Sequence, residues 1–146
     1  MIFILFLSSF VENLLIFKKK SKMLNRGDDM TSKVSFKVVD SHLIIKFEGE
    51  LDNMATYQYK TKLCEVIKLN EFEMVIMDLN NVTFIDSSGI GLILGRYNQI
   101  QKYGGHLILC GINKHIKKTI QISGIASIID IYEDSYDQLK QSEVLL

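Results

Sequence analysis

The apolar positions in the first half of the chain follow two different periods. Between residues 34 and 39 every second residue is apolar, which predicts a half-buried strand. A polar turn pair follows, and residues 42–47 predict a second strand, so that the two form a hairpin. From Tyr57 to Asn70 the apolar spacing changes to three and four residues, which predicts a helix with Tyr57 on its apolar face. Residues 48–52 are expected to form the connecting loop, in which Asp52 or the residue after it caps the helix.

The clearest change of pattern lies between Val75 and Tyr103. Residues 75–79 are a nearly continuous apolar run, which is typical of a strand buried on both faces. Asn80-Asn81 interrupts the run, and residues 82–85 then lead into the polar segment Asp86-Ser87-Ser88, after which the spacing becomes helical. Side-chain oxygens of Asp and Ser accept the N–H bonds of a helix's first turn. We therefore expect this polar segment to lie where a strand passes into a helix.

The segment after this central helix completes a β-α-β unit. Gly104-Gly105 breaks the helical pattern, and residues 107–110 form another short apolar run. A helix that joins two neighbouring strands in this way makes them parallel, with a right-handed connection. The chain continues with a predicted helix over 113–123, a strand over 128–131 and a helix over 134–141.

The helix predicted over 113–123 is expected to turn Ile116, Ile120 and Ile122 inward, and Gly124 is expected to end it. The predicted order of elements is therefore ββαβαβαβα. This order describes a single α/β domain in which a mixed β-sheet is packed with α-helices.

Length and composition narrow the class of protein. A chain of 146 residues is long enough for one domain with a substantial core, and 47% hydrophobic with 23% charged residues is ordinary for a soluble globular protein. The formal net charge of +0 gives no reason to expect direct binding to nucleic acid. Cys64 and Cys110 lie in apolar periodic segments without a metal-type spacing. We expect them to be buried thiols of a reduced, cytoplasmic protein.

The N-terminal segment departs from the rest of the chain. Residues 2–7 and 14–17 are strongly apolar, but Glu12 interrupts them and three lysines follow. Neither a membrane-spanning helix nor a cleavable signal fits this pattern well. We expect residues 1–29 to be an extension that arises from an over-extended gene start, and residues 30–146 to be the domain. A membrane-surface helix and a short membrane anchor remain the alternatives for the extension.

A family resemblance appears at the strand-to-helix junction. The segment from Thr83 to Tyr97, with its Asp-Ser-Ser-Gly core, resembles the phosphorylation-site segment of the anti-sigma factor antagonists, which are small STAS-domain proteins. Its ending, Gly95-Arg96-Tyr97, is more similar to the sporulation type, and residues 49–52 resemble the loop after the family's second strand. The resemblance spans roughly residues 33–139 and implies a STAS-like fold. One departure is Ala55-Thr56, where members often carry Thr-Ala.

The resemblance implies a regulatory binding protein. In its unphosphorylated form it would bind an anti-sigma factor that is also a serine kinase, and so free a sigma factor. Phosphorylation of Ser87 would switch this binding off, and a serine phosphatase would restore it. The residues expected to bind the partner are Asp52, Asp86, Ser88, Gly89, Gly91, Gly95 and Arg96.

Three features at the central helix have alternative interpretations. Ser87, Gly91 and Gly95 are four residues apart, so they form a stripe of small residues that allows another backbone to approach closely. The stripe could face either the sheet beneath or a docked protein. Arg96 could be a partner contact or a solvated charge that stabilises the C-terminal half of the helix. Asp86, Ser87 and Ser88 could also serve only as helix caps.

Other classes of function find less support in the sequence. A hydrolase using Ser87 needs a general base, and the chain's 3 histidines lie in no recognisable motif. No phosphate-binding Gly-Lys-Ser/Thr occurs, and the spacing of Asp52, Asp78 and Asp86 matches no metal loop. We therefore expect no enzymatic activity, no metal and no cofactor, and a protein that is the substrate of a kinase. The alternative function is a STAS module that binds a small ligand or serves a membrane assembly, although we do not expect a membrane partner.

Overall fold

A computed structural model describes residues 32–143 of the chain. In chain order its elements are β1 (Lys33–Val39), β2 (His42–Leu51), α2 (Asn53–Leu69), β3 (Met74–Ile85), α3 (Ser87–Lys102), β4 (His106–Cys110), α4 (Lys117–Ser123), the 3-10 helix η1 (Ile125–Ser127), β5 (Asp130–Ile131) and α5 (Tyr136–Gln141). The predicted α/β class is confirmed, and the observed order differs only by the added 3-10 helix. The extension predicted over residues 1–29 lies outside the described residues.

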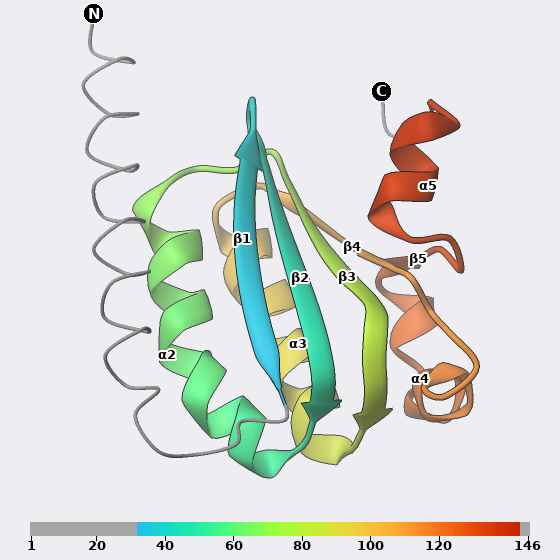
Figure 1. The fold of residues 1–146 in the computed structure, drawn as a ribbon. Helices are drawn as coiled ribbons and strands as arrows, with labels where there is room; N and C mark the ends of the chain where they lie inside the picture. The colour runs from blue at the N-terminus through green and yellow to red at the C-terminus, as the bar shows by residue number, and fades with distance from the viewer. Residues whose placement is uncertain (1–31, 144–146) are drawn as a thin grey trace, which may run out of the picture. The chain divides into compact units, whose positions relative to one another are not determined.

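The strands form one mixed sheet in the order β1-β2-β3-β4-β5. β1 and β2 pair as an antiparallel hairpin, whereas β2, β3, β4 and β5 are mutually parallel. Figure 1 shows α2 and α3 side by side, each joining two of the parallel strands. Because those strands run in the same direction, their carboxyl ends, and the loops that follow them, lie at one edge of the sheet.

Both faces of the central strands are buried, which explains their continuous apolar runs. Phe47 of β2 packs its ring against Tyr59 of α2, so this face of the sheet meets the helix pair. Side chains alternate between the two faces of a strand. The opposite face carries Ile44, Ile76 and Ile108, which pair across three strands and form a buried cluster with two residues of α5. The predicted strand buried on both faces is thereby confirmed.

A buried carboxylate attaches α5 to this second face. Asp78 is 5% exposed, and its Oδ2 accepts a hydrogen bond of 3.1 Å from the backbone N–H of Tyr136, the first residue of α5. Its Oδ1 accepts from the N–H of Asn80 at 2.9 Å. The side chain therefore satisfies two backbone donors inside the fold. It does not join Asp52 and Asp86 in a carboxylate cluster.

The predicted loop over residues 48–52 is wrong, because β2 continues to Leu51. β3 likewise runs through Asn80-Asn81 to Ile85. The two strands stay paired because β3 absorbs extra residues in irregularities, where the register shifts between Lys46 and Glu48 and again between Gly49 and Glu50. The polar residues at the ends of these strands are therefore exposed, and the two strands stay paired through them.

The C-terminal elements are shorter than predicted. α4 begins only at Lys117, and the strand predicted over 128–131 is reduced to Asp130–Ile131 by the 3-10 helix before it. Gly124 ends α4 with a left-handed φ of 73°, as predicted. Ile116 and Ile120 are buried as expected. Ile122 is 75% exposed, so its predicted inward position is wrong.

Candidate functional site

Two helix N-termini lie next to each other at the carboxyl edge of the sheet. Leu51 and Ile85, the last residues of β2 and β3, pair directly, and each is followed by an aspartate that caps the next helix. The Oδ1 of Asp52 accepts the N–H of Ala55 at 2.9 Å. The Oδ1 of Asp86 accepts the N–H groups of Ser88 and Gly89 at 2.8 and 3.1 Å. Of the predicted cap candidates, Asp52 and Asp86 are the caps, and the predicted strand-to-helix junction is confirmed.

Gly89 fixes the distance between these two junctions. A β-carbon on Gly89 would collide with the backbone oxygen of Leu51 and would lie 2.7 Å from Cγ1 of Ile85. The first turn of α3 therefore packs directly on the end of β2, and Gly89 is buried. This residue, predicted to contact a partner, positions the site from within the fold.

The two serines of the junction differ in their surroundings. Ser87 is the first residue of α3 and is exposed. Ser88 is half-buried, and its hydroxyl donates a hydrogen bond of 3.4 Å to Oδ1 of Asn53, the first residue of α2. The hydroxyl of Ser87 is thus the more accessible of the two, whereas that of Ser88 links the two helix starts.

The position of Ser87 suits a phosphoryl group. The first N–H groups of a helix carry partial positive charge, and α3 has no acidic side chain in its first turn. A dianionic group on this hydroxyl would face the favourable end of the helix dipole and open solvent. The arrangement can therefore receive a phosphate without rearranging the fold.

The stripe of small residues on α3 faces away from the sheet. A β-carbon on Gly91 or Gly95 would have no heavy atom within 4 Å outside its own helix. The alternative in which the stripe packs on the sheet beneath is therefore excluded for both glycines. Together with Ser87 they leave an outward strip of α3 on which another chain's backbone can approach closely.

Arg96 lies inside the fold, which corrects both interpretations of it. Its side chain is 9% exposed, and its Nη1 donates a hydrogen bond of 2.9 Å to the backbone oxygen of Lys60 on α2. Nε2 of Gln99 similarly donates to the oxygen of Cys64 at 2.9 Å. These bonds form a polar seam between α2 and α3. Arg96 is neither a solvated charge nor a surface contact.

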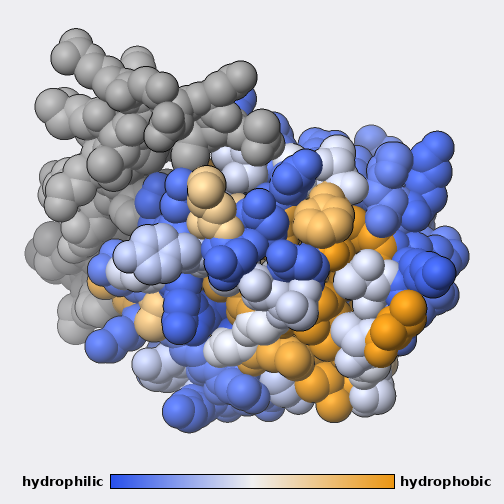
Figure 2. Space-filling model, turned by 90° about the horizontal axis from the view of Figure 1, so that it is seen from below, coloured by the Kyte–Doolittle hydropathy of each residue, from blue (hydrophilic) through white to orange (hydrophobic). Residues whose placement is uncertain are grey.

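Three large apolar side chains on α2 and β3 are exposed, and they are not among the residues predicted from the sequence to bind a partner. Met54 and Tyr57, in the first turns of α2, are 71% and 85% exposed, and Phe84, two residues before Asp86, is 47% exposed. Tyr57 was expected on the inward face, which is instead formed by Ala55, Tyr59, Leu63, Val66 and Ile67. Figure 2 views the end at which β2 and β3 terminate and shows hydrophobic side chains among hydrophilic ones. Exposed aromatic and Met side chains of this kind are typical of protein-binding surfaces.

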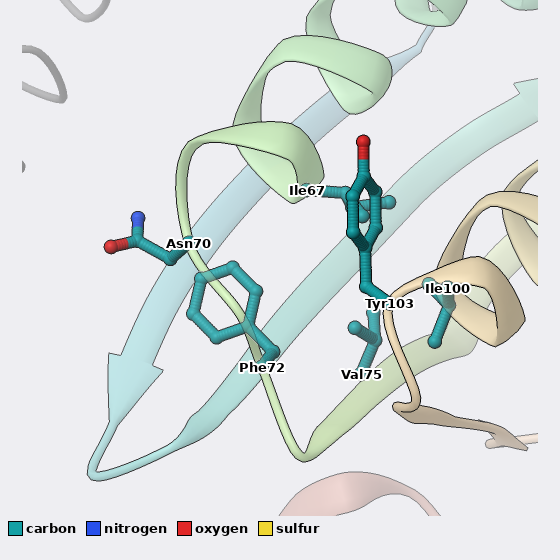
Figure 3. A pocket seen from close by; sticks show the side chains of 6 residues that line it. All are labelled: Ile67, Asn70, Phe72, Val75, Ile100 and Tyr103. Atoms are coloured by element: carbon teal, nitrogen blue, oxygen red, sulfur yellow. The ribbon is translucent and has the colours of Figure 1, made fainter.

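The described residues include a small pocket but no metal-binding group and no membrane-spanning helix. Within residues 32–143 no group of three His, Cys, Asp or Glu side chains could hold a metal ion. In the same range no helix is long and apolar enough to cross a bilayer. A small pocket lies near the C-terminal ends of α2 and α3, far along both helices from Ser87, and Figure 3 shows its lining of Ile67, Asn70, Phe72, Val75, Ile100 and Tyr103. These side chains are mainly apolar, and Tyr103 contributes the one ionisable group among them.

Comparison with known proteins gives consistent matches over the described domain. A family model described as STAS domain matches residues 33–138. The anti-sigma F factor antagonist of Paenibacillus polymyxa is 34% identical over 103 residues, which cover 70% of this chain and 88% of that protein. The anti-sigma factor antagonist SpoIIAA in its unphosphorylated form gives a TM-score of 0.59 at 25% identity, covering 77% of this chain and 97% of that chain. The phosphorylated form of the Bacillus cell fate determinant SpoIIAA gives 0.59 at 26%, covering 77% and 99%.

Proposed function

This chain belongs to the STAS domain family, and from that premise we propose that it acts as an anti-sigma factor antagonist. It binds an anti-sigma factor and so frees the sigma factor that the anti-sigma factor had held. The observation that carries the proposal is the accessible Ser87 at the start of α3, beside the outward stripe of Gly91 and Gly95. A hydroxyl in this place is open to modification and lies where a docked protein would cover it.

The proposed docking face combines Ser87 with exposed residues of α2, α3 and the end of β3. Its members are Met54, Tyr57, Phe84, Ser87, Gly91 and Gly95. The glycines allow close approach, and the three large side chains provide apolar area to bury. Asp52 and Asp86 place carboxylates at its edge, where a basic side chain of the partner would find them. Ser88, Gly89 and Arg96 support the face by holding α3 against β2 and α2.

Phosphorylation of Ser87 switches the docking off. A phosphoserine adds about −1.5 to −2 charge at neutral pH. Buried in an interface beside Asp86, that charge is costly, whereas the helix N-terminus tolerates it in the free protein. The modification therefore lowers the affinity for the partner and leaves the fold intact. We propose that the anti-sigma factor is itself the serine kinase and that a serine phosphatase removes the phosphate.

The sporulation type is the favoured member of the family. The ending Gly95-Arg96-Tyr97 supports it, and so does the relation to the anti-sigma F factor antagonist named above. In this role the protein acts in the cytoplasm on a transcription regulator and binds no nucleic acid itself.

The experiment that tests the proposal is phosphate mapping. The full chain is incubated with ATP and the anti-sigma factor kinase from the same genome, and its intact mass and phosphopeptides are measured. We expect one phosphate on Ser87, none on the Ser87→Ala variant, and unchanged modification of Ser88→Ala. Phosphate on Ser88 with Ser87 untouched, or no phosphate on the wild-type chain, would contradict the proposed switch.

A further inference from the structure

Charge is distributed unevenly across the edge of the sheet that carries Ser87. On the β2 side, Glu48 and Glu50 are exposed and Asp52 follows them. On the β4 side, the loop that follows the strand carries basic side chains. Ser87, after the central strand β3, lies between the two. The acidic residues, the serine and the basic segment therefore belong to three successive parallel strands of the sheet or directly follow them, and β4 ends opposite Asp78, before β3 reaches Ile85.

The basic segment comprises residues 114–118, in which only the central residue, Ile116, is apolar. Ile116 is fully buried and anchors the segment, whereas Lys114, His115, Lys117 and Lys118 are exposed. Lys117 forms an ion pair with Glu133. Within residues 32–143 neither Lys114 nor Lys118 forms an ion pair, so their charges remain available to a partner.

Asn113 holds this segment against β3 at residues 79–82. Its Nδ2 donates to the backbone oxygens of Leu79, Asn80 and Val82 at 3.3, 3.0 and 2.8 Å. Its Oδ1 accepts the N–H of His115 at 2.9 Å, which fixes the start of the basic loop. Val82 is four residues before Asp86. The lysines therefore extend from a rigid support that is bonded to the strand leading into the docking face.

We propose that Lys114 and Lys118 are a specificity-determining extension of the docking face and contact acidic side chains of the anti-sigma factor. The inference rests on the proposed function, because it identifies part of the surface that the same partner covers. A partner with basic side chains opposite Asp52 and acidic ones opposite Lys114 fits in one orientation, which brings its centre over Ser87. Complementary charge at an interface rim raises the association rate and excludes wrongly oriented encounters.

The neighbouring charges favour an acidic protein surface over other polyanions. Glu48, Glu50 and Asp52 lie at the same edge of the sheet. A nucleic acid or an anionic bilayer presents negative charge everywhere, so it would meet these carboxylates while it met the lysines. A protein can match both signs at once.

The test compares two pairs of charge reversals. One variant carries Lys114→Glu and Lys118→Glu. The matched control carries Lys68→Glu and Lys102→Glu, in the last turns of α2 and α3 at the opposite end of the domain. Both variants change the net charge by the same amount. If the first variant melts at a lower temperature than wild type, a variant with Lys114→Gln and Lys118→Gln replaces it. Association rate and Kd for the anti-sigma factor from the same genome are measured at low and high salt, with Ser87→Glu included.

At low salt we expect the Lys114 and Lys118 variant to associate at least about tenfold more slowly than wild type, and at high salt its association rate should approach that of wild type. The association rate of the control should stay near that of wild type. Equal behaviour of the two variants would overturn the inference. If wild type binds the anti-sigma factor, Ser87→Glu does not bind it, and the Lys114 and Lys118 variant associates as fast as wild type, only this inference fails. If wild type does not bind or Ser87→Glu binds fully, the proposed function itself fails.

Discussion

The backbone oxygen of Leu51 occupies the space that a β-carbon on Gly89 would need. Leu51 ends β2, and Gly89 lies in the first turn of α3, so the contact joins the end of one strand to the helix that follows the next strand. It holds the caps Asp52 and Asp86 close together. Any side chain larger than hydrogen at position 89 must move α3 away from β2.

Alanine at two positions of the same helix should therefore have opposite effects. Gly89→Ala forces α3 outward, and we expect it to lower the free energy of unfolding by about 1–3 kcal/mol, as overpacking does. Gly91→Ala meets open space and replaces a poor helix former, so we expect a gain of up to about 1 kcal/mol. Urea unfolding measures both. Equal losses of unfolding free energy at the two positions would show that the contact with Leu51 does not determine the effect of a side chain at position 89.

Gly95→Leu should separate docking from folding. Because a side chain at this position projects into open space, the melting temperature should stay within a few degrees of wild type. The same leucine would stand on the stripe that the partner approaches, so we expect affinity for the anti-sigma factor to fall by at least about tenfold, a loss of about 1.4 kcal/mol. Full affinity in a folded variant would remove Gly95 from the docking face.

Stability should decline at alkaline pH. Burial, with a smaller contribution from Asp78, raises the pKa of the Cys110 thiol well above its usual range, and burial also raises the pKa of Tyr59. The unfolded chain therefore releases these protons at lower pH than the folded chain does. The free energy of unfolding should be constant up to about pH 8.5 and then fall as the pH rises, first through Cys110 and later through Tyr59.

Urea unfolding between pH 7.5 and 10 checks this expectation. Cys110→Ala costs stability at every pH, but its stability should change less with pH just above 8.5 than that of wild type. An identical dependence on pH in the two proteins would show that Cys110 does not contribute.

Replacement of Asn113 tests the support of the basic segment. In Asn113→Asp the side chain no longer donates to the oxygens of Leu79, Asn80 and Val82, so we expect a loss of about 1–3 kcal/mol. Asn81→Ala is the control, since Asn81 is exposed and the side-chain bond that it receives from Asn80 is exposed as well. A thermal melt in which the two variants lose equally little would contradict the supporting role of Asn113.

Features that depend on only a few neighbouring residues could be predicted from the sequence. Caps depend on the identity of one or two residues, so the sequence limited them to Asp52 or Asn53 and to one of residues 86–88, and the structure selects Asp52 and Asp86. Strands buried on both faces need continuous apolar runs, and the runs in β3 and β4 were found. Residues 48–51 were missed because pairing through bulges depends on the neighbouring strand and leaves no local signal.

Other positions depend on partners that are distant in the sequence. Both Tyr57 and Tyr59 fit a helical face, but Tyr59 is the buried one because its ring packs on Phe47 and its hydroxyl donates to Ser32 at 3.0 Å. Arg96 is buried because a backbone carbonyl of α2 accepts a hydrogen bond from its guanidinium. No pattern within α3 could reveal this bond. The exposure of Phe84 likewise follows from the tertiary fold. The sequence therefore placed Ser87 at a strand-to-helix junction, and the structure shows which side chains of α2 and β3 are exposed.

The most direct test of the central claim is the affinity of Ser87 variants for the anti-sigma factor. Ser87→Ala adds no charge and removes no cap, because Asp86 is the capping residue, so it should bind like wild type. Ser87→Glu places a carboxylate beside Asp86 on the docking face and should bind at least about tenfold more weakly while it melts at the same temperature. If Ser87→Glu binds as tightly as wild type, charge at Ser87 does not control docking and the account is contradicted.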